Sequence, residues 1–266
     1  MSQEQPADDS SNTSADVTRQ PVGEFRVGDV LSAGFGALFS NFGNYTLVAG
    51  VVYLPLIIAA LLIDDGISFI LLDFNQVGWA GYTSGMFLAV MLGFVAYAAV
   101  VFGALEQEAG NKIGALQMLR GGLAYIIPVL IASCLITLLF LLGLILLVIP
   151  GIIIMLALEA TIPAIVAENR GPIEAMKRSA ELASGYKWHI LGVVIVVFFV
   201  QIVFSTAINF IPEQMQDTNG YIGMATYFIE NAVSTALGGT IAAAIYTRLR
   251  PAKEGVLGDD IAEVFA

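Results

Sequence analysis

The chain has 266 residues, of which 58% are hydrophobic and only 12% are charged, about half the charged fraction of an ordinary soluble domain. A chain of this length cannot bury so much apolar surface in one water-soluble core, so lipid must be part of its solvent. The net charge of -11, without a basic stripe, argues against a nucleic-acid partner, and the single cysteine, Cys134, excludes an intramolecular disulfide.

The two ends of the chain differ from the rest in composition. Residues 1–24 are polar and acidic and precede the first aromatic residue, Phe25. They lack the basic stretch and short apolar run of a cleaved signal peptide, so we predict a disordered acidic tail in the cytoplasm. Residues 251–266 form a second acidic cytoplasmic tail. The segment between them, 25–250, is expected to be a single membrane domain.

Six apolar runs follow one another in this domain, each close to the roughly 20 residues that a helix needs to cross a hydrocarbon core. They lie at about 45–63, 83–105, 125–149, 152–167, 188–210 and 223–247. Only Pro150 and Gly151 separate the third run from the fourth, and because Pro-Gly is a turn signal we expect a tight hairpin there. We therefore predict an all-α integral membrane protein with six transmembrane helices arranged as three hairpins. A short helix is also expected at 67–74, in the first outer loop.

All the lysines and arginines lie on one side of this layout. They are Arg19, Arg26, Lys112, Arg120, Arg170, Lys177, Arg178, Lys187, Arg248, Arg250 and Lys253. The connections on the other side contain acids and no base. Because cytoplasmic loops carry the excess of Lys and Arg, we predict a bacterial cytoplasmic (inner) membrane protein with both termini in the cytoplasm. One kinked helix in place of the second hairpin, at Pro150-Gly151, would break this pattern.

A shorter segment with helical periodicity precedes each hairpin. Apolar residues recur at spacings of three and four over 27–42, 113–123 and 173–183, opposite polar or charged residues. Such segments are typical of amphipathic helices at the cytoplasmic membrane surface. The chain then reads as one unit used three times, at 25–105, 111–167 and 172–247, although a chance recurrence of amphipathicity would give the same pattern.

The third amphipathic segment has the clearest boundaries. Pro172 suits the first position of a helix, and Gly185 suits the C-terminal cap. Three basic residues, Lys177, Arg178 and Lys187, are expected to face anionic headgroups.

Two acidic residues lie inside apolar runs, Glu159 in the fourth and Glu230 in the sixth. Both come about eight residues after the start of their run, which places them roughly 12 Å deep at 1.5 Å per residue. A charge at that depth is costly unless it is paired or protonated, so such residues mark candidate functional sites. With Asn231 and Gln201 they form a candidate buried polar site. The alternative is that these groups only join helices by hydrogen bonds.

Small residues recur at every fourth position in the second and sixth runs, at Gly85, Ala89 and Gly93 and at Ala232, Ala236, Thr240 and Ala244. Such stripes allow close helix packing, either within the monomer or in a homo-oligomer. Motifs for catalysis, metal binding and nucleotide binding are absent from the sequence, and the single histidine, His189, cannot supply paired metal ligands. We therefore expect no catalytic residue, no cofactor and no metal.

Residues 149–190 carry a distinctive series: Pro150-Gly151, Glu168, Gly171-Pro172, Lys177-Arg178-Ser179, Gly185 and Trp188. Together with the V-G-D-V-L-S segment at 27–32, this series resembles the glycerophosphoryl diester phosphodiesterase membrane-domain family. The resemblance covers most of 25–247 and implies a multi-helix inner-membrane domain, sometimes fused to a soluble phosphodiesterase barrel and often standing alone. This sequence contains no such barrel, so the resemblance implies neither an activity nor functional residues.

The sequence thus favours a multi-pass protein without catalytic activity that acts as a membrane-embedded accessory or scaffold. The alternative is a small-solute or lipid transporter that uses the buried carboxylates, and an intramembrane enzyme is a third hypothesis. A water-filled cavity that reaches Glu159 or Glu230 would favour transport, whereas a dry bundle would favour the scaffold. The expected partners are the lipid bilayer and either a second copy of the chain or another membrane protein.

Overall fold

The computed structural model describes residues 25–62, 74–215 and 221–265, and these residues form helices and turns without a strand. The expected outer-loop helix at 67–74 and the N-terminal tail at 1–24 lie outside the described residues, except for Phe74. In chain order the helices are α1 (Val27–Ser40), α2 (Phe42–Leu62), α4 (Phe74–Glu108), α5 (Ala115–Ala124), α6 (Ile126–Leu146), α7 (Val148–Leu158), α8 (Thr161–Glu168), α9 (Pro172–Ala183), α10 (Lys187–Gln214) and α11 (Tyr221–Phe265).

In the part of the chain that the structure describes, six helical stretches are long and apolar enough to cross a membrane. They are Phe42–Ala59, Thr83–Glu108, Ile126–Leu146, Val148–Glu168, Lys187–Pro212 and Tyr221–Gly255. The predictions of an all-α protein and of six apolar helices are confirmed at this level. Helices α1, α5 and α9 also occur where amphipathic segments were predicted, and their position at a membrane surface stays a prediction.

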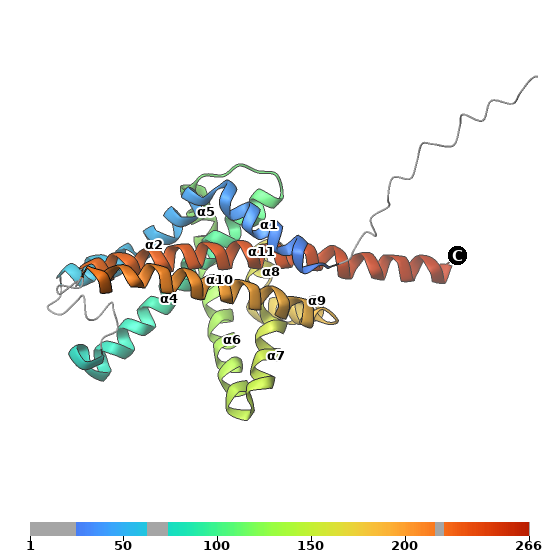
Figure 1. Ribbon diagram of the computed structural model, residues 1–266. Coiled ribbons are helices and arrows are strands. Elements are labelled where there is room, and N and C mark those ends of the chain that lie inside the picture. The colour runs from blue at the N-terminus through green and yellow to red at the C-terminus, as the bar shows by residue number, and fades with distance from the viewer. Residues whose placement is uncertain (1–24, 63–73, 216–220, 266) are drawn as a thin grey trace, which may run out of the picture.

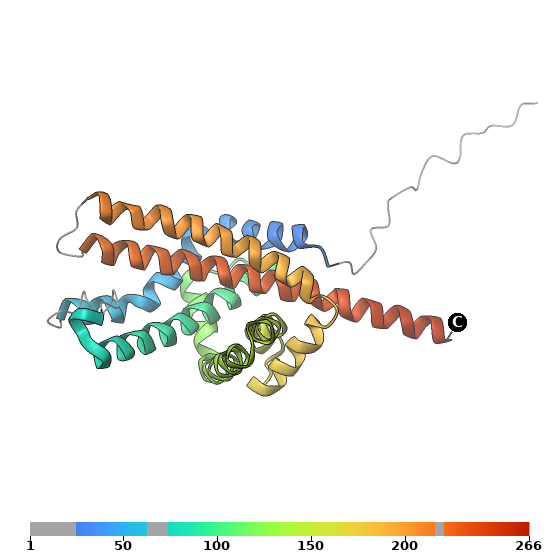
Figure 2. The same cartoon turned by 60° about the horizontal axis from the view of Figure 1, so that its bottom comes forward.

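Four long helices, α2, α4, α10 and α11, run along a common axis and form the main bundle (Figures 1 and 2). At one end of the bundle, the hydroxyl of Tyr45 in α2 donates a hydrogen bond of 2.8 Å to Oε1 of Gln107 in α4. Arg248 of α11 lies 3.7 Å from Glu108 at the same end of α4. Helix α9, which contains Lys177 and Arg178, and the start of α10 at Lys187 lie toward this end too (Figure 1). Because these bases and Arg248 gather there, we call it the basic end.

Small residues bring α11 close to its neighbours. Ala236, Thr240 and Ala244 are buried within the monomer, and a Cβ atom on Gly239 would lie only 2.6 Å from Cγ1 of Val100 in α4. This small-residue stripe therefore serves packing inside one chain. Beyond the stripe, α11 continues as a helix through Pro251 to Phe265.

The short helices pack on the flanks of the bundle. A Cβ on Gly34 of α1 would meet Cδ1 of Ile241 in α11 at 2.5 Å, and a Cβ on Gly122 of α5 would meet Cα of Ala99 in α4 at 2.4 Å. At Gly122 the contact is with backbone, so only glycine fits there. At Gly34 it is with the end of the Ile241 side chain, and the nearest backbone atom, Cα of Ile241, lies 3.1 Å away. Helix α9 begins at Pro172, and Gly185 follows it with a φ of +93°, in line with the predicted boundaries.

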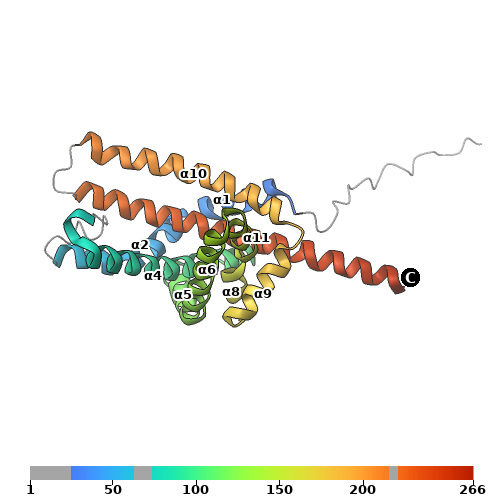
Figure 3. The ribbon, with the colours of Figure 1, turned by 90° about the horizontal axis from the view of Figure 1, so that it is seen from below.

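Helices α6 and α7 form a hairpin that projects crosswise to the main bundle (Figures 1 and 3). The turn of this hairpin is Leu147, whose backbone is extended, with φ -173° and ψ 148°. The predicted turn at Pro150-Gly151 is therefore wrong by three residues. Pro150 is the third residue of α7, where a helix tolerates proline because that position has no N–H partner to lose. Gly151 instead allows α6 and α7 to pack closely, since a Cβ on Gly143 would lie 2.7 Å from Cα of Gly151.

Candidate functional site

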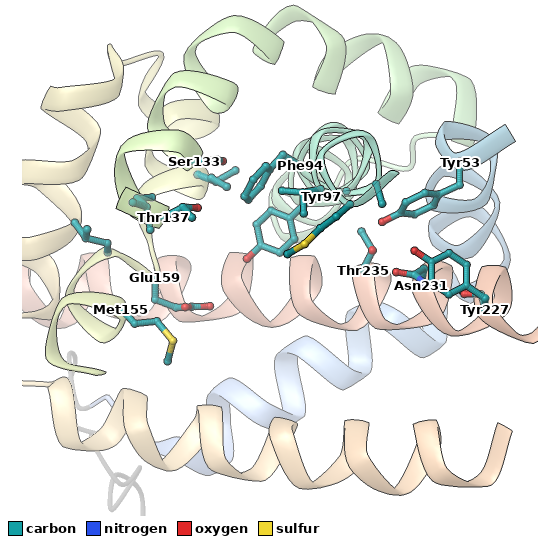
Figure 4. Close-up of a pocket in the computed structure, with 17 residues that line it drawn as sticks. Tyr53, Phe94, Tyr97, Ser133, Thr137, Met155, Glu159, Tyr227, Asn231 and Thr235 are labelled. Carbon is teal, nitrogen blue, oxygen red and sulfur yellow. The ribbon is translucent and has the colours of Figure 1, made fainter. Parts of the chain in front are cut away.

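A pocket of about 620 Å³ lies in the angle between the crosswise hairpin and the main bundle, and we call it the Glu159 pocket (Figure 4). Its volume is in the range typical of small-molecule sites. The lining comes from five parts of the chain and combines apolar, aromatic and polar side chains. It comprises Tyr53 of α2; Met86, Ala89, Val90, Gly93, Phe94 and Tyr97 of α4; Ser133, Ile136 and Thr137 of α6; Met155, Leu158, Glu159 and Ile162 of α7, α8 and the turn between them; and Tyr227, Asn231 and Thr235 of α11.

Glu159 occupies the point at which α7 ends and the chain turns through Ala160 into α8. The apolar helix α7 leads directly to this residue, and the break in the helix directs its carboxyl group into the pocket (Figure 4). The hydroxyl of Tyr97 points toward it (Figure 4). Among the described residues, no Lys, Arg or His side chain lines the pocket, so none of these bases pairs with the carboxyl group there.

Ser133 and Thr137 stand one helical turn apart on the α6 wall of the pocket. Ser133 is only 2% exposed, and its hydroxyl has no hydrogen-bond partner among the described residues. A buried polar group without a partner costs about 1–3 kcal/mol.

The opposite end of the pocket is built on one face of α11. Tyr227, Asn231 and Thr235 follow one another at intervals of four residues, and Tyr53 of α2 lies beside Thr235. Nδ2 of Asn231 donates a hydrogen bond of 2.8 Å to the backbone oxygen of Tyr227, which fixes the amide. The pocket therefore has a carboxyl group at one end and phenol, amide and hydroxyl groups at the other (Figure 4).

The four residues of the candidate polar site separate into two groups. Glu159 and Asn231 line the same pocket, but Glu230 does not. Adjacent helical residues are turned by about 100° from one another, and Glu230 points toward α10, where it accepts a hydrogen bond of 2.8 Å from Nδ2 of Asn209. Gln201 lines a second, apolar groove between α1, α10 and α11.

The three predicted interfacial bases also differ from one another. Lys177 is exposed and Lys187 is half-buried. The side chain of Arg178 is only 17% exposed, and it pairs with the carboxylates of Glu168 and Glu254. Burial opposes its charge, but these two hydrogen-bonded carboxylates outweigh that effect and raise the pKa of the guanidinium. Arg178 therefore faces inward, to acids of its own chain, and the contact of the three bases with headgroups stays a prediction.

Glu168 is the centre of this inward cluster, and sequence reasoning gave it no role. Its side chain is 10% exposed, and its oxygens accept hydrogen bonds from Arg170, Arg178 and Tyr246. The cluster joins α8, α9 and α11 at the basic end. In the sequence, Glu168 stands at the head of the segment that leads to Pro172, the first residue of α9. Between them, Asn169 has a left-handed backbone with a φ of +49°.

Metal binding finds no support in the described ranges, where no three His, Cys, Asp or Glu side chains gather to hold an ion. Residues 74–249, well over half of the chain, match the family described as Domain of unknown function (DUF7847), and the chain belongs to that family. This match gives no link to the glycerophosphoryl diester phosphodiesterase membrane-domain family. No curated protein and no solved structure matches the chain.

Proposed function

We propose that this member of the DUF7847 family is a membrane-embedded binding protein or carrier for a small amphipathic molecule that bears a cationic amine. The observation that carries the proposal is the Glu159 pocket, in which a carboxyl group without a counter-ion faces a cavity with apolar walls. A water-filled cavity that reaches Glu159 or Glu230 is the feature expected to favour transport over a scaffold role. A cavity does reach Glu159, and the polar groups on its wall support the transport hypothesis.

The described lining of the pocket offers Glu159 no positive side chain. A carboxylate at membrane depth is costly unless a positive group accompanies it. Since no base lines the pocket, a ligand that carries an ammonium group would supply the missing partner of Glu159. An anionic ligand would meet a carboxyl group and no base, so the pocket disfavours phosphate or carboxylate head groups.

The shape and chemistry of the remaining wall fit the same class. Rings of Tyr53, Phe94, Tyr97 and Tyr227 contribute to the lining, and aromatic faces attract ammonium groups. Met86 and Val90 add an apolar side that suits an alkyl chain. Hydroxyl groups, including the unpaired one of Ser133, would hold a polar substituent of the ligand.

Binding and release without chemical change is part of the proposal, as is a location in a bacterial inner membrane with both termini in the cytoplasm. The one-sided distribution of Lys and Arg supports this orientation. The second candidate function remains an accessory or scaffold role. Helix α10 favours it, because Ile195, Phe198, Phe199 and Val203 present a broad exposed apolar face on which a second copy or another membrane protein could pack.

Equilibrium binding of a matched pair of probes tests the proposal. Octylamine and octanol, each with the same fluorophore at the end of the alkyl chain, are titrated into the protein in detergent. We expect Glu159→Gln to weaken octylamine binding about 10- to 100-fold, because it removes one charge-assisted hydrogen bond of about 1.5–3 kcal/mol. The affinity for octanol should change much less.

Glu230→Gln is the control, because Glu230 lies outside the pocket and contacts Asn209. It should leave the affinity for octylamine unchanged. Equal octylamine affinity in wild type and Glu159→Gln, or an equal loss in both variants, would rule out the proposed role of the pocket.

A further inference from the structure

The crosswise hairpin differs from the other long helices in direction. Helices α2, α4, α10 and α11 share one axis, and α6 and α7 leave that bundle sideways (Figures 1 and 3). If the shared axis is the direction in which the bundle crosses the bilayer, the hairpin runs along the membrane plane. The length of the hairpin and the composition of its tip also show whether it can cross the bilayer.

The second arm of the hairpin is too short to cross. Helix α7 has 11 residues, which is about 16 Å at 1.5 Å per residue and roughly half of a 30 Å hydrocarbon core. The chain then turns at Glu159 and Ala160 into α8, which packs against α4, α9 and α11. The apolar stretch of residues 148–168 is therefore two helices with different directions.

The tip of the hairpin is apolar in a way that a surface turn is not. The sequence from Leu138 to Leu158 contains no polar side chain. At the tip, Ile145 is 79% exposed and Leu147 is 68% exposed. The two other connections on that side of the predicted layout contain Asp64, Asp65, Asp73, Glu213 and Asp217. A tip that reached the opposite membrane surface would place bare isoleucine and leucine side chains among headgroups and water.

The backbone of the turn residue, Leu147, is paired within the hairpin. The N–H of Leu147 donates to the oxygen of Gly143 at 3.0 Å, and the oxygen of Leu147 accepts from the N–H of Gly151 at 3.4 Å. Pro150 carries no N–H, so the first turn of α7 has one unpaired donor fewer. Backbone groups in lipid must be satisfied within the protein, and these two bonds satisfy the N–H and the C=O of Leu147.

The depth of the hairpin follows from the helices that it touches. Tyr97 of α4 and Ser133 of α6 line one pocket, and Tyr97 precedes Glu108, at the basic end, by 11 residues, or about 16 Å. That level is close to the middle of a bilayer. On the other arm, Oγ of Ser179 in α9 donates a hydrogen bond of 2.8 Å to the oxygen of Ala157. Since α9 belongs to the basic end, the hairpin lies between that end and the bilayer centre.

We propose that α6 and α7 do not cross the bilayer and instead lie within the half of the bilayer that faces the basic end, with their tip at Leu147 surrounded by acyl chains. The chain then has four crossing helices and one membrane-embedded hairpin. Both termini stay on the same side of the membrane, so the distribution of bases is as well explained as by six crossings. The Glu159 pocket lies in the angle that the hairpin makes with the bundle.

Accessibility of single cysteines in the Cys134→Ala background tests this placement in the full chain. An impermeant maleimide is applied to intact cells and to inverted vesicles carrying Leu147→Cys. Controls are Gln216→Cys, in the connection between α10 and α11, and Glu174→Cys, at an exposed position of α9. In parallel, a small fluorophore on Leu147→Cys is quenched with lipids brominated either near the headgroup or deep in the acyl chain.

We expect Leu147→Cys to react from neither side, with stronger quenching by the deep bromines, while each control reacts from one side. Labelling of Leu147→Cys in intact cells, as for Gln216→Cys, would show a crossing hairpin and overturn the proposal. Labelling in inverted vesicles alone would place the tip in water at the basic end and overturn it equally. Ile145→Cys serves as a second variant because its side chain makes little contact in the fold. The result is independent of whether the Glu159 pocket binds an amine.

Discussion

The hydroxyl of Tyr246 donates a hydrogen bond of 2.8 Å to Oε1 of Glu168, a residue 78 positions earlier in the chain. The bond ties α11 to the end of α8, at the point where Arg178 of α9 reaches the same carboxylate oxygen. Three helices of the basic end thus meet at one acid. The junction therefore holds the end of α8 against α9 and α11.

Tyr246→Phe should therefore destabilise the protein without changing its packing volume. Tyr246 is buried, and a hydrogen bond to a charged group contributes about 1.5–3 kcal/mol. We expect the variant to unfold at lower temperature in detergent, as measured by the loss of helical circular dichroism. Glu168→Ala should lower the transition further, since it also removes a partner of Arg178. Glu174→Ala, an exposed acid of α9, should change nothing; a Tyr246→Phe transition equal to that of wild type would contradict the role of the junction.

Two glycines of α1 form a matched pair for testing how closely α1 packs on α11. A Cβ on Gly34 would lie 2.5 Å from Cδ1 and 3.1 Å from Cα of Ile241, whereas a Cβ on Gly36 would meet nothing within 4 Å. Gly34→Ala should cost about 1–3 kcal/mol through overpacking. Gly36→Ala should stabilise by about 0.4–1 kcal/mol because alanine restricts the unfolded chain. Unfolding in detergent with added denaturant measures both, and equal effects of the two changes would refute this packing.

Two buried serines form a second matched pair. Ser133 in the pocket wall is 2% exposed with an unpaired hydroxyl, and Ser179 of α9 is fully buried with its hydroxyl bonded to the oxygen of Ala157. Without ligand, Ser133→Ala should be neutral or stabilising by about 1 kcal/mol, because it removes an unsatisfied polar group. Ser179→Ala should be destabilising by about 0.5–1.5 kcal/mol. Thermal unfolding of the two variants side by side distinguishes them, and destabilisation by Ser133→Ala equal to that by Ser179→Ala would mean that the Ser133 hydroxyl has a partner.

The helices themselves could be predicted because an apolar run of sufficient length determines a membrane helix almost alone. Each of the six predicted runs overlaps one of the six helical stretches, and Pro172 and Gly185 gave the limits of α9. The turn at Leu147 could not be found, because leucine carries no turn signal and the proline that suggested a turn is accepted in the first turn of a helix. The crosswise direction of the hairpin also produces no periodic pattern in the sequence from which it could have been predicted.

The candidate site was predictable only in part. Depth in an apolar run identified Glu159, but its neighbours Tyr97 and Ser133 come from α4 and α6, and nothing in their spacing relates them to it. The choice between Glu230 and Asn231 depended on a rotation of one residue about the axis of α11, finer than the accuracy with which a run boundary can be drawn. An acid is a conspicuous residue in a membrane run, while a tyrosine or serine is not.

Photolabelling tests the central claim, occupancy of the Glu159 pocket by an amphipathic amine, most directly. An octylamine that carries a diazirine in its alkyl chain is irradiated with the protein in detergent, with and without excess unlabelled octylamine, and the modified residues are located by peptide mass spectrometry. We predict labelling at Met86, Phe94 and Met155, suppressed by the competitor and reduced in Glu159→Gln. Labelling confined to the exposed face of α10, for example at Phe198, and insensitive to competitor would contradict the account.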